Sequence, residues 1–362
     1  MISNVICNSA KQGLIPQREY FDKDIANSDN TNGYYIIESN DFVYNPRKSA
    51  DAPYGPISSY QYSEAGIVSP LYLCFRAKRE INPLYFEWYF RSSAWHRYIY
   101  MSGDSGARHD RVSIKDDVFF AMPINVPSAK EQERISLFLD AIERRIETQR
   151  TLVETLKKYK RGLLNKLFSN INSNIYPTVY LSEVADFLQG LTYNPSDVSV
   201  SGYLVLRSSN IQNGMLSFDD CVYVDKKVDE SLQVKCDDVI MCVRNGSKNL
   251  VGKTALIPPN MPMTTWGAFM MIIRSKLNDT YIFHYLNSQM FFSQVFKDTG
   301  TATINQITKG ILNECRLPLP PETERKQISK MLSSFDAKIQ NAEKCLATLV
   351  NLKKALLQQL FI

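Results

Sequence analysis

One stretch of the chain occurs twice, and this duplication limits the possible folds more than any other sequence feature. Residues 127–168 align without gaps to residues 320–361 at a constant offset of 193, and 13 of the 42 aligned positions are identical. Each copy follows a proline-bearing extended segment, MPINVP or RLPLPP, and both end in the pattern LLxxLF. Proline suits a first helical turn and ends what precedes it, so we expect two related helices.

Both copies carry an apolar stripe at alternating spacings of four and three residues, which is typical of a coiled-coil seam. The seam residues are Ile135, Leu139, Ile142, Ile146, Val153, Leu156 and Leu163 in the first copy, and Ile328, Leu332, Phe335, Ile339, Leu346, Leu349 and Leu356 in the second. About 41 helical residues would form a rod of roughly 60 Å. Two long helices in a larger bundle would have the same periodicity, but the duplication favours pairing of the two copies, antiparallel if the domains between them lie at opposite ends.

A lysine occupies the same seam position in both copies, Lys160 in the first and Lys353 in the second. A seam lysine weakens the interface but can fix its register. Alternatively, its stem lies along the interface and its amine stays in water. Both interpretations stay open at the level of sequence.

The remaining residues predict two globular domains, 1–126 and 169–319, which alternate with the helical segments 127–168 and 320–362. Short β-rich runs in the first domain are residues 34–37, 42–44, 66–69 and 72–75, with a helix over 83–97. The second domain has comparable runs at 203–206, 239–243, 254–257 and 269–273, with a helix over 281–296. The expected fold class is α+β: two mixed α/β domains separated by two long helices that pair as an antiparallel coiled coil, with a pseudo-two-fold internal repeat.

Composition excludes several classes of protein. The chain has 362 residues, a net charge of +5, seven cysteines and three histidines. Because no two cysteines have CxxC spacing, we expect buried free thiols in a reducing cytoplasm and no metal site. No apolar run is long enough to span a bilayer, and the N-terminus lacks a secretion signal, so the expected location is cytoplasmic without membrane contact.

Motifs for catalysis are lacking in the sequence. A stand-alone methyltransferase should have a glycine-rich cofactor loop after a strand and an Asn/Asp-Pro-Pro-aromatic tetrapeptide. The nearest match, Asn45-Pro46-Arg47, lacks the second proline and the aromatic residue. The chain also has no GxxxxGK[ST] loop for ATP. We expect a turn at Asn45, and no catalysis by this chain.

The helical segments resemble the specificity subunit of type I restriction–modification systems. The resemblance rests on Pro127–Ile142 (PSAKEQERISLFLDAI), on its ending Leu156–Phe168 (LKKYKRGLLNKLF) and on the degenerate second copy. In the domains, residues 13–21, 68–75, 203–214 and 251–257 resemble that family's target-recognition domains. The resemblance covers essentially the whole chain.

This resemblance implies a function and partners. Each domain would be a target-recognition domain that reads one half of a bipartite site on double-stranded DNA. The helical pair would set the gap between the half-sites and dock two modification (methyltransferase) subunits, with restriction (translocase/nuclease) subunits completing the enzyme. No cofactor is expected on this chain; S-adenosylmethionine would be bound by the modification subunits and ATP by the restriction subunits.

One departure from the family pattern concerns the first domain. The second domain has a lead-in, residues 176–202, before its segment 203–214, whereas the first domain begins almost directly at the corresponding segment. About 25 residues of the second domain therefore have no counterpart in the first. This predicts an N-terminally short first domain.

The charge surplus lies on the predicted helices. Residues 127–168 have a net charge of +4 and residues 320–362 of +3, whereas each globular domain has −1. Because phosphate neutralisation dominates non-specific affinity for DNA, each domain alone should bind DNA poorly, and partner subunits should supply most of the affinity. Tight, steeply salt-dependent binding by the isolated chain would contradict this expectation.

For base contacts, the expected residues are those in polar turns whose side chains pair with guanine or adenine. They are Arg47, Lys48, Arg108 and Arg111 in the first domain, and Arg207, Asn210, Arg244, Asn245, Lys248, Thr303, Asn305 and Gln306 in the second. Each of them could equally be an ordinary solvated loop residue. Unchanged affinity and methylation-site choice in Arg108→Ala and Asn305→Ala would contradict the assignment.

Two other functions explain part of the sequence. The same two domains and helices could belong to a related restriction–methylation enzyme that is not type I, which neighbouring genes would distinguish. A coiled-coil interaction protein without a DNA role would leave the duplicated domains unexplained. Co-purification with a methyltransferase subunit would exclude this second alternative.

Overall fold

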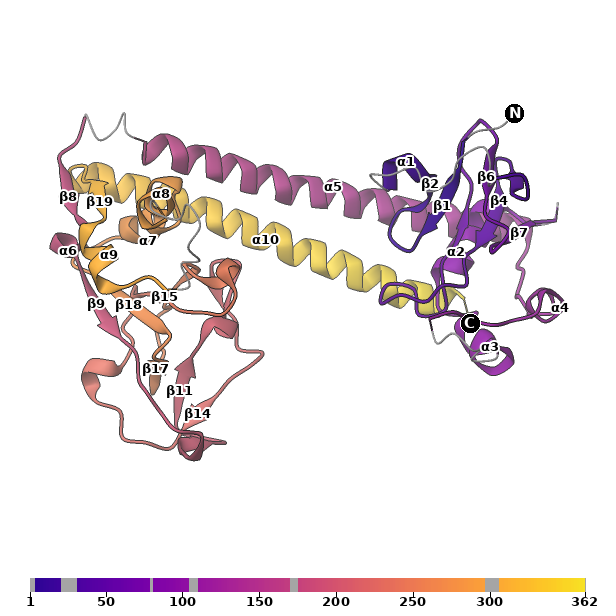
Figure 1. The fold of residues 1–362 in the computed structure, drawn as a ribbon. Coiled ribbons are helices and arrows are strands. Elements are labelled where there is room, and N and C mark those ends of the chain that lie inside the picture. The colour runs from indigo at the N-terminus through magenta and orange to yellow at the C-terminus, as the bar shows by residue number, and fades with distance from the viewer. Residues whose placement is uncertain are drawn as a thin grey trace. The chain divides into compact units, whose positions relative to one another are not determined.

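A computed structural model describes residues 4–20, 31–78, 81–103, 110–169, 175–296 and 306–361. Its two longest helices are α5 (Ala129–Leu167) and α10 (Glu322–Leu360) (Figure 1). The chain divides into two compact units: unit 1 contains residues 1–150 and 344–362, and unit 2 contains residues 151–343. Each unit therefore holds one half of each long helix together with one globular domain.

The two long helices pair in an antiparallel sense within each unit. In unit 1, Ile135 of α5 joins the same hydrophobic core as Leu356 near the end of α10. In unit 2, Leu164 near the end of α5 shares a core with Leu332 near the start of α10. Every predicted seam residue is buried or half-buried. The paired helices, the mixed domains and the internal repeat confirm the predicted fold class.

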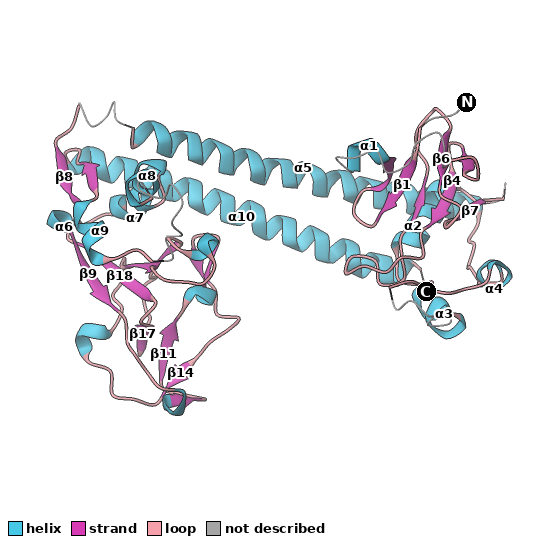
Figure 2. Cartoon of the chain, in the orientation of Figure 1, coloured by secondary structure: helices cyan, strands magenta, loops and turns pink. Residues whose placement is uncertain are grey.

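Unit 1 builds its domain from short antiparallel strands (Figure 2). The strands are β1 (Ile6–Ser9), β2 (Gly13–Pro16), β3 (Tyr35–Ile37), β4 (Asp41–Tyr44), β5 (Ile57–Ser59), β6 (Gly66–Val68) and β7 (Leu73–Arg76). They form a β1–β2 hairpin, a β3–β6 pair and a three-stranded sheet in the order β5-β4-β7. The helices are α1 (Gln17–Tyr20), α2 (Pro83–Arg91), α3 (His96–Ser102) and α4 (Asp116–Phe120). An aromatic core fills the space between the sheet, α2 and the long helices.

Unit 2 contains two four-stranded sheets, in the orders β16-β15-β18-β9 and β10-β14-β11-β17. Their strands are β9 (Ala185–Gln189), β10 (Val198–Ser199), β11 (Tyr203–Leu206), β14 (Tyr223–Val224), β15 (Val239–Cys242), β16 (Thr254–Leu256), β17 (Thr264–Trp266) and β18 (Met270–Ser275). Two further pairs join β8 (Thr178–Tyr180) to β19 (Arg316–Pro318) and β12 (Ile211–Gln212) to β13 (Met215–Leu216). The α-helices are α6 (Leu181–Val184), α7 (Tyr281–Leu286), α8 (Gln289–Val295) and α9 (Lys309–Glu314). Single 3-10 turns cover 195–197, 208–210, 230–232 and 248–250.

The sheet of unit 1 corresponds strand by strand to part of a sheet in unit 2. In unit 1, Phe42 of β4 lies opposite Ser59 of β5 and Phe75 of β7. In unit 2, Val239 of β15 lies opposite Leu256 of β16 and Ile273 of β18. These pairs are related by offsets of 197 and 198 residues, so β5-β4-β7 has the register of β16-β15-β18. The duplication therefore includes the domains as well as the helices.

Both helices predicted inside the domains are wrong in one respect, because each is interrupted. The helix predicted over 83–97 is α2 followed by α3, and the one predicted over 281–296 is α7 followed by α8. At both breaks a serine hydroxyl donates to the carbonyl three residues earlier: Ser92 to Tyr89 at 2.6 Å, and Ser288 to Tyr285 at 2.7 Å. Serine competes with the helical backbone in this way, and Ser288 then caps α8. A periodic apolar face did not reveal these breaks.

The cysteines are free, but their predicted burial is only partly right. Cys242 and Cys315 are buried, whereas Cys236 and Cys345 are exposed and the others half-buried. In the part of the chain that the structure describes, no cluster of potential metal ligands occurs. Over the same residues, no helix combines the length and apolar character that a membrane span requires.

Candidate nucleic-acid interface

The same backbone arrangement joins two predicted DNA-reading loops in each unit. In unit 1, the loop after β4 and the segment before α4 form an isolated antiparallel bridge between Arg47 and Arg111. In unit 2, the loop after β15 and the segment before α9 form the equivalent bridge between Arg244 and Gln306. A backbone hydrogen bond supports each bridge, from Val112 to Pro46 at 2.9 Å and from Ile307 to Val243 at 2.7 Å. Each domain thus brings together two polar residues that lie about 60 positions apart in the sequence.

Three predicted cations line one cavity of unit 1. Arg47, Lys48 and Arg111 lie around a hollow of about 420 Å³, with Tyr72 on its wall. The Arg47 side chain is 68% exposed, and its Nε lies 3.8 Å from an Asp110 carboxylate oxygen. Arg111 is half-buried, and its Nε has no hydrogen-bond partner among the described residues. A guanidinium with an unused buried donor, beside two further cations, suits an anionic or acceptor-rich ligand.

The equivalent cavity of unit 2 combines a cation, an amide and an aromatic ring. Arg244 and Gln306 are both exposed and line a hollow of about 440 Å³ together with Phe269. The Arg244 guanidinium lies 5.3 Å from the centroid of the Phe269 ring, within cation–π range. Its backbone N–H donates to the Phe269 carbonyl at 3.1 Å. The ring therefore holds the guanidinium at the surface in a limited set of orientations.

Phe269 was not among the predicted site residues. The sequence places it at the start of an apolar run, residues 269–273, and we interpreted it as a strand residue. In the structure β18 begins one residue later, and the Phe269 side chain is 59% exposed. The only sequence signal for an exposed aromatic residue here is weak: Phe269 is the first residue of the apolar run and follows Gly267-Ala268.

Asn245, Lys248 and Arg207 line neither of these two cavities. The Asn245 amide donates to the Ser208 hydroxyl at 3.1 Å, and Lys248 is exposed at the following turn. Arg207 forms an ion pair with Asp220 at 2.8 Å. These residues lie at the surface or near it, and contact with DNA stays a prediction for each of them.

Asn210 requires a correction. Its side chain is fully buried, and its amide nitrogen donates to the carbonyls of Ser217 and Asp220, both at 3.0 Å. Its carbonyl oxygen accepts from the Arg207 backbone at 2.9 Å. Because both donors of the amide are used inside the domain, Asn210 holds this turn together and presents no amide to a base. Its polar character and its turn-like context are equally typical of such a structural asparagine.

Three predicted contact residues, Arg108, Thr303 and Asn305, lie outside the described residues. Their proposed contacts with DNA stay predictions. The described neighbours Arg111 and Gln306 mark the ends of the two segments that carry them.

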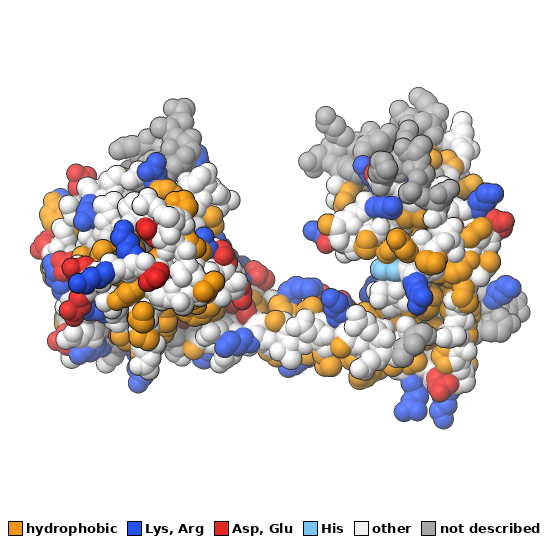
Figure 3. Space-filling view, turned by 90° about the horizontal axis from the view of Figure 1, so that it is seen from below, with side chains coloured by type: hydrophobic (Ala, Val, Ile, Leu, Met, Phe, Trp, Pro, Cys, Tyr) orange, Lys and Arg blue, Asp and Glu red, His pale blue; other side chains and the backbone are white. Residues whose placement is uncertain are grey.

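Basic side chains do not form a continuous face in the view of Figure 3. Over unit 2, on the left of that view, Lys and Arg side chains alternate with Asp and Glu. Several cations are paired with carboxylates, such as Lys226 with Asp197 at 3.9 Å and Lys276 with Asp186 at 3.1 Å. This mixed surface agrees with the near-neutral charge of each domain.

Comparison with known proteins identifies the second half of the chain. Residues 176–350 match the family model described as the type I restriction modification DNA specificity domain. Among curated proteins, the chain is 28% identical over 171 residues to the EcoKI specificity subunit of Escherichia coli K12 and 28% identical over 176 residues to the StySPI specificity subunit of Salmonella potsdam. These matches cover 45% and 46% of this chain, and 36% and 38% of the two relatives.

The fold has solved counterparts. A chain from a structure of a type I R-M system, solved to explain complex assembly and conformational transition, matches with a TM-score of 0.59 and 19% identity. The match covers 90% of this chain and 82% of that one. At this identity the likeness concerns the fold alone.

The matched residues 176–350 comprise most of the second globular domain and much of α10, so this part of the chain carries the type I restriction modification DNA specificity domain. The chain is similar to type I restriction enzyme specificity subunits over this part, which confirms the resemblance seen in the sequence; it spans well under half the length of these two curated relatives.

Proposed function

We propose that this chain is the DNA-recognition subunit of a type I restriction–modification enzyme, and that it reads a two-part target on double-stranded DNA. Each domain would contact one half-site through the bridged pair of loops described above. One observation carries the proposal: both domains present a bridged pair of polar residues, Arg47 with Arg111 and Arg244 with Gln306, beside a surface cavity. Arginine and glutamine are side chains that recognise guanine and adenine edges.

The pairing of α5 with α10 supports a spacer role for the long helices. Their apolar seams are covered by each other, so their outer faces stay available for other subunits. The two helical segments carry the surplus positive charge of the chain, +4 over residues 127–168 and +3 over residues 320–362. We propose that the helix pair sets the separation of the two half-sites and docks two modification subunits, to which restriction subunits add.

The proposed subunit has no catalytic role. Within the described residues, no histidine or carboxylate lines either cavity, so the hydroxyl and thiol groups around the cavities have no such base beside them in the lining. S-adenosylmethionine would be held by the modification subunits and ATP by the restriction subunits. The assembly would act on DNA in the cytoplasm.

Methylation mapping tests the proposal. The chain is co-expressed with its modification subunits, and methylated adenines are mapped across the host genome with and without the gene. We expect a bipartite methylated sequence that disappears without this chain. Arg244→Ala should relax one half of that sequence, and Arg47→Ala the other, because each lost base contact costs about 1–3 kcal/mol of discrimination.

Lys248→Ala provides a matched control, because Lys248 is an exposed cation of the same loop that does not line the cavity. We expect it to weaken binding uniformly without relaxing either half-site. Relaxation of the same half-site by Arg47→Ala and Arg244→Ala, or a methylation pattern independent of this gene, would contradict the proposal.

A further inference from the structure

The bridge between Arg47 and Arg111 has a backbone geometry that places its two side chains together. Backbone hydrogen bonds flank the bridge on both sides, from Val112 to Pro46 at 2.9 Å and from Lys48 to Asp110 at 2.8 Å. Bonds placed on the flanking residues define a non-hydrogen-bonded antiparallel pair. In such a pair the Cα atoms lie about 4.5 Å apart, and both side chains leave the same face of the backbone.

The bridge of unit 2 shares this geometry and one of its residues. The Arg244–Gln306 bridge contains the bond equivalent to the first of these, at 2.7 Å. Arg244 and Arg47 are related by an offset of 197 residues, which is also the offset between β15 and β4. Both domains therefore direct an arginine from the loop after the central strand to the cavity beside it.

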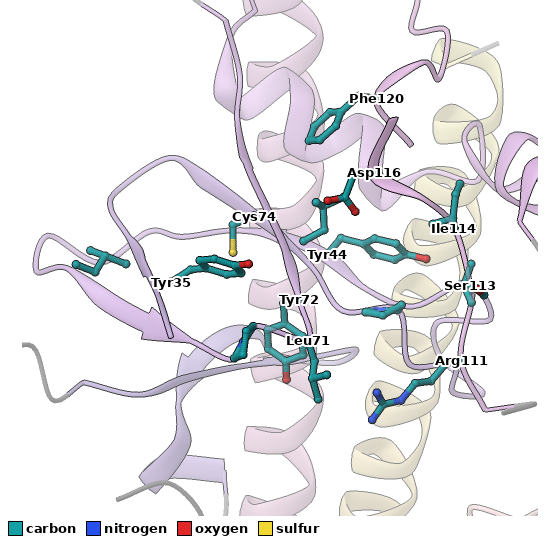
Figure 4. Close-up of a pocket in the computed structure, with 15 residues that line it drawn as sticks. Tyr35, Tyr44, Leu71, Tyr72, Cys74, Arg111, Ser113, Ile114, Asp116 and Phe120 are labelled. Atoms are coloured by element: carbon teal, nitrogen blue, oxygen red, sulfur yellow. The ribbon is translucent and has the colours of Figure 1, made fainter. Parts of the chain in front are cut away.

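An exposed apolar side chain lines both cavities. Leu71 and Phe269 occupy the same position, two residues before the first position that β7 shares with β18. They are 62% and 59% exposed. In the view of Figure 4, Leu71 lies between Tyr72 and the guanidinium of Arg111, and all three line the cavity of unit 1. Because the two cavities are copies of one arrangement, the positions at which they differ are informative.

The bridge partner of the shared arginine is such a position. It is Arg111 in unit 1 and Gln306 in unit 2. A guanidinium carries only donors, whereas an amide carries both donors and an acceptor. In the major groove guanine presents two acceptors, N7 and O6, and adenine presents the N7 acceptor and the N6 amino donor. Arg111 therefore matches guanine, and Gln306 matches adenine.

The same difference argues against a phosphate contact at this position. Phosphate oxygens only accept, and they bind a charged donor more strongly than a neutral one. The phosphates are also the same in both half-sites, so an exchange of arginine for glutamine would only weaken the contact. Bases differ between half-sites, and a base contact therefore accounts for the exchange.

We propose, on the basis of the function proposed above, that the bridge partner selects one base of each half-site. Arg47 and Arg244 each read a guanine, so a guanine occurs in both halves. Arg111 reads a second guanine next to the first, whereas Gln306 reads an adenine at the corresponding place. Neighbouring base pairs fit the bridge, because its Cα separation of about 4.5 Å is close to the rise of about 3.4 Å per base pair.

Reciprocal exchange of the two bridge partners tests this inference. Arg111→Gln and Gln306→Arg are each co-expressed with the modification subunits, and the methylated sequences are mapped. We expect Arg111→Gln to change the second base of the half-site relaxed by Arg47→Ala from guanine to adenine. Gln306→Arg should change the corresponding base of the other half-site from adenine to guanine. Each preference should shift by about 5- to 150-fold, the discrimination of one bidentate contact.

Gln189→Arg is the matched control. Gln189 is exposed and lines the cavity of unit 2, but it belongs to β9 and not to the bridge. This variant should not produce a guanine at the position read by Gln306. Unchanged bases in both exchange variants, or the change to guanine in Gln189→Arg alone, would overturn the inference and leave the proposed function intact. A wild-type chain that directs no bipartite methylated sequence would overturn both.

Modified duplexes test the contact without methylation. The complex with the modification subunits is titrated with target duplexes in which 7-deazaadenine replaces the adenine assigned to Gln306. This base lacks N7 but still pairs with thymine. We expect it to weaken binding of the wild-type complex by about fivefold or more, and to leave the Gln306→Ala complex unaffected. Equal sensitivity of the two complexes would show that Gln306 does not contact this base, and would overturn the inference.

Discussion

Lys353 donates a hydrogen bond to Glu143 across the helix pair, with 2.7 Å between Nζ and Oε2. Lys160 forms the corresponding ion pair with Asp336. Lys160 and Lys353 occupy one position of the repeat, and Glu143 and Asp336 occupy another, so the same bridge forms twice. Of the two roles left open by the sequence, the structure favours register: each seam lysine is bound to the opposite helix.

A double-mutant cycle on Lys353 and Glu143 measures this bridge. We expect Lys353→Met and Glu143→Gln each to lower the urea midpoint, with a coupling energy of about 0.5–1 kcal/mol. Lys354→Met is the matched control, because Lys354 is exposed and forms no ion pair in the described residues. A coupling energy of zero would show that the bridge does not contribute to register or stability.

Leu139 and Leu332 occupy one repeat position, and both are fully buried. Leu139→Ala and Leu332→Ala should each lower the free energy of unfolding by about 2–5 kcal/mol, because each leaves a cavity in a packed core. Leu137→Ala, on the same helix but 54% exposed, should change it by less than about 0.5 kcal/mol. Similar losses for all three variants in chemical denaturation would contradict the assigned seam.

The lowered pKa of His284 predicts that the protein loses stability in acid. Burial, and then the nearby Lys160 charge, lower the pKa of this imidazole from 6.5 to about 3. Between these values the unfolded chain binds a proton that the folded chain does not, so stability falls as the pH is lowered, by up to about 1.4 kcal/mol per pH unit. His284→Gln should flatten the pH dependence of the urea midpoint between pH 6 and 4. His96 is present in both the wild-type protein and the variant, so its contribution cancels when the two are compared. Equal slopes of urea midpoint against pH for the two proteins would refute the assignment.

Arg274 and Arg76 make the same ion pair in different surroundings. Arg274→Ala leaves the Asp238 side chain, which is 2% exposed, without its cation, and should cost about 3–5 kcal/mol. Arg76→Ala should cost clearly less, because Arg76 is 59% exposed and the Asp41 carboxylate gains access to water. Thermal unfolding of both variants checks the order, and a larger loss for Arg76→Ala would be the contrary result.

The amino-acid sequence alone determined the periodic part of this protein. The offset of 193 residues and the seams around Leu139 and Leu332 predict paired helices, because a narrow apolar stripe is stable only when another stripe covers it. Local patterns were sufficient for these conclusions because each depends on spacing along the chain.

Tertiary structure decided which polar residues act together. Arg47 meets Arg111, and Arg244 meets Gln306, through backbone bridges between segments that no local pattern connects. Asn210 resembles a base-reading residue in the sequence, yet its amide is used inside the domain. Burial and long-range pairing decide whether a polar group contacts water, a ligand or another part of the same domain. Burial and pairing are properties of the packed chain and not of the local sequence.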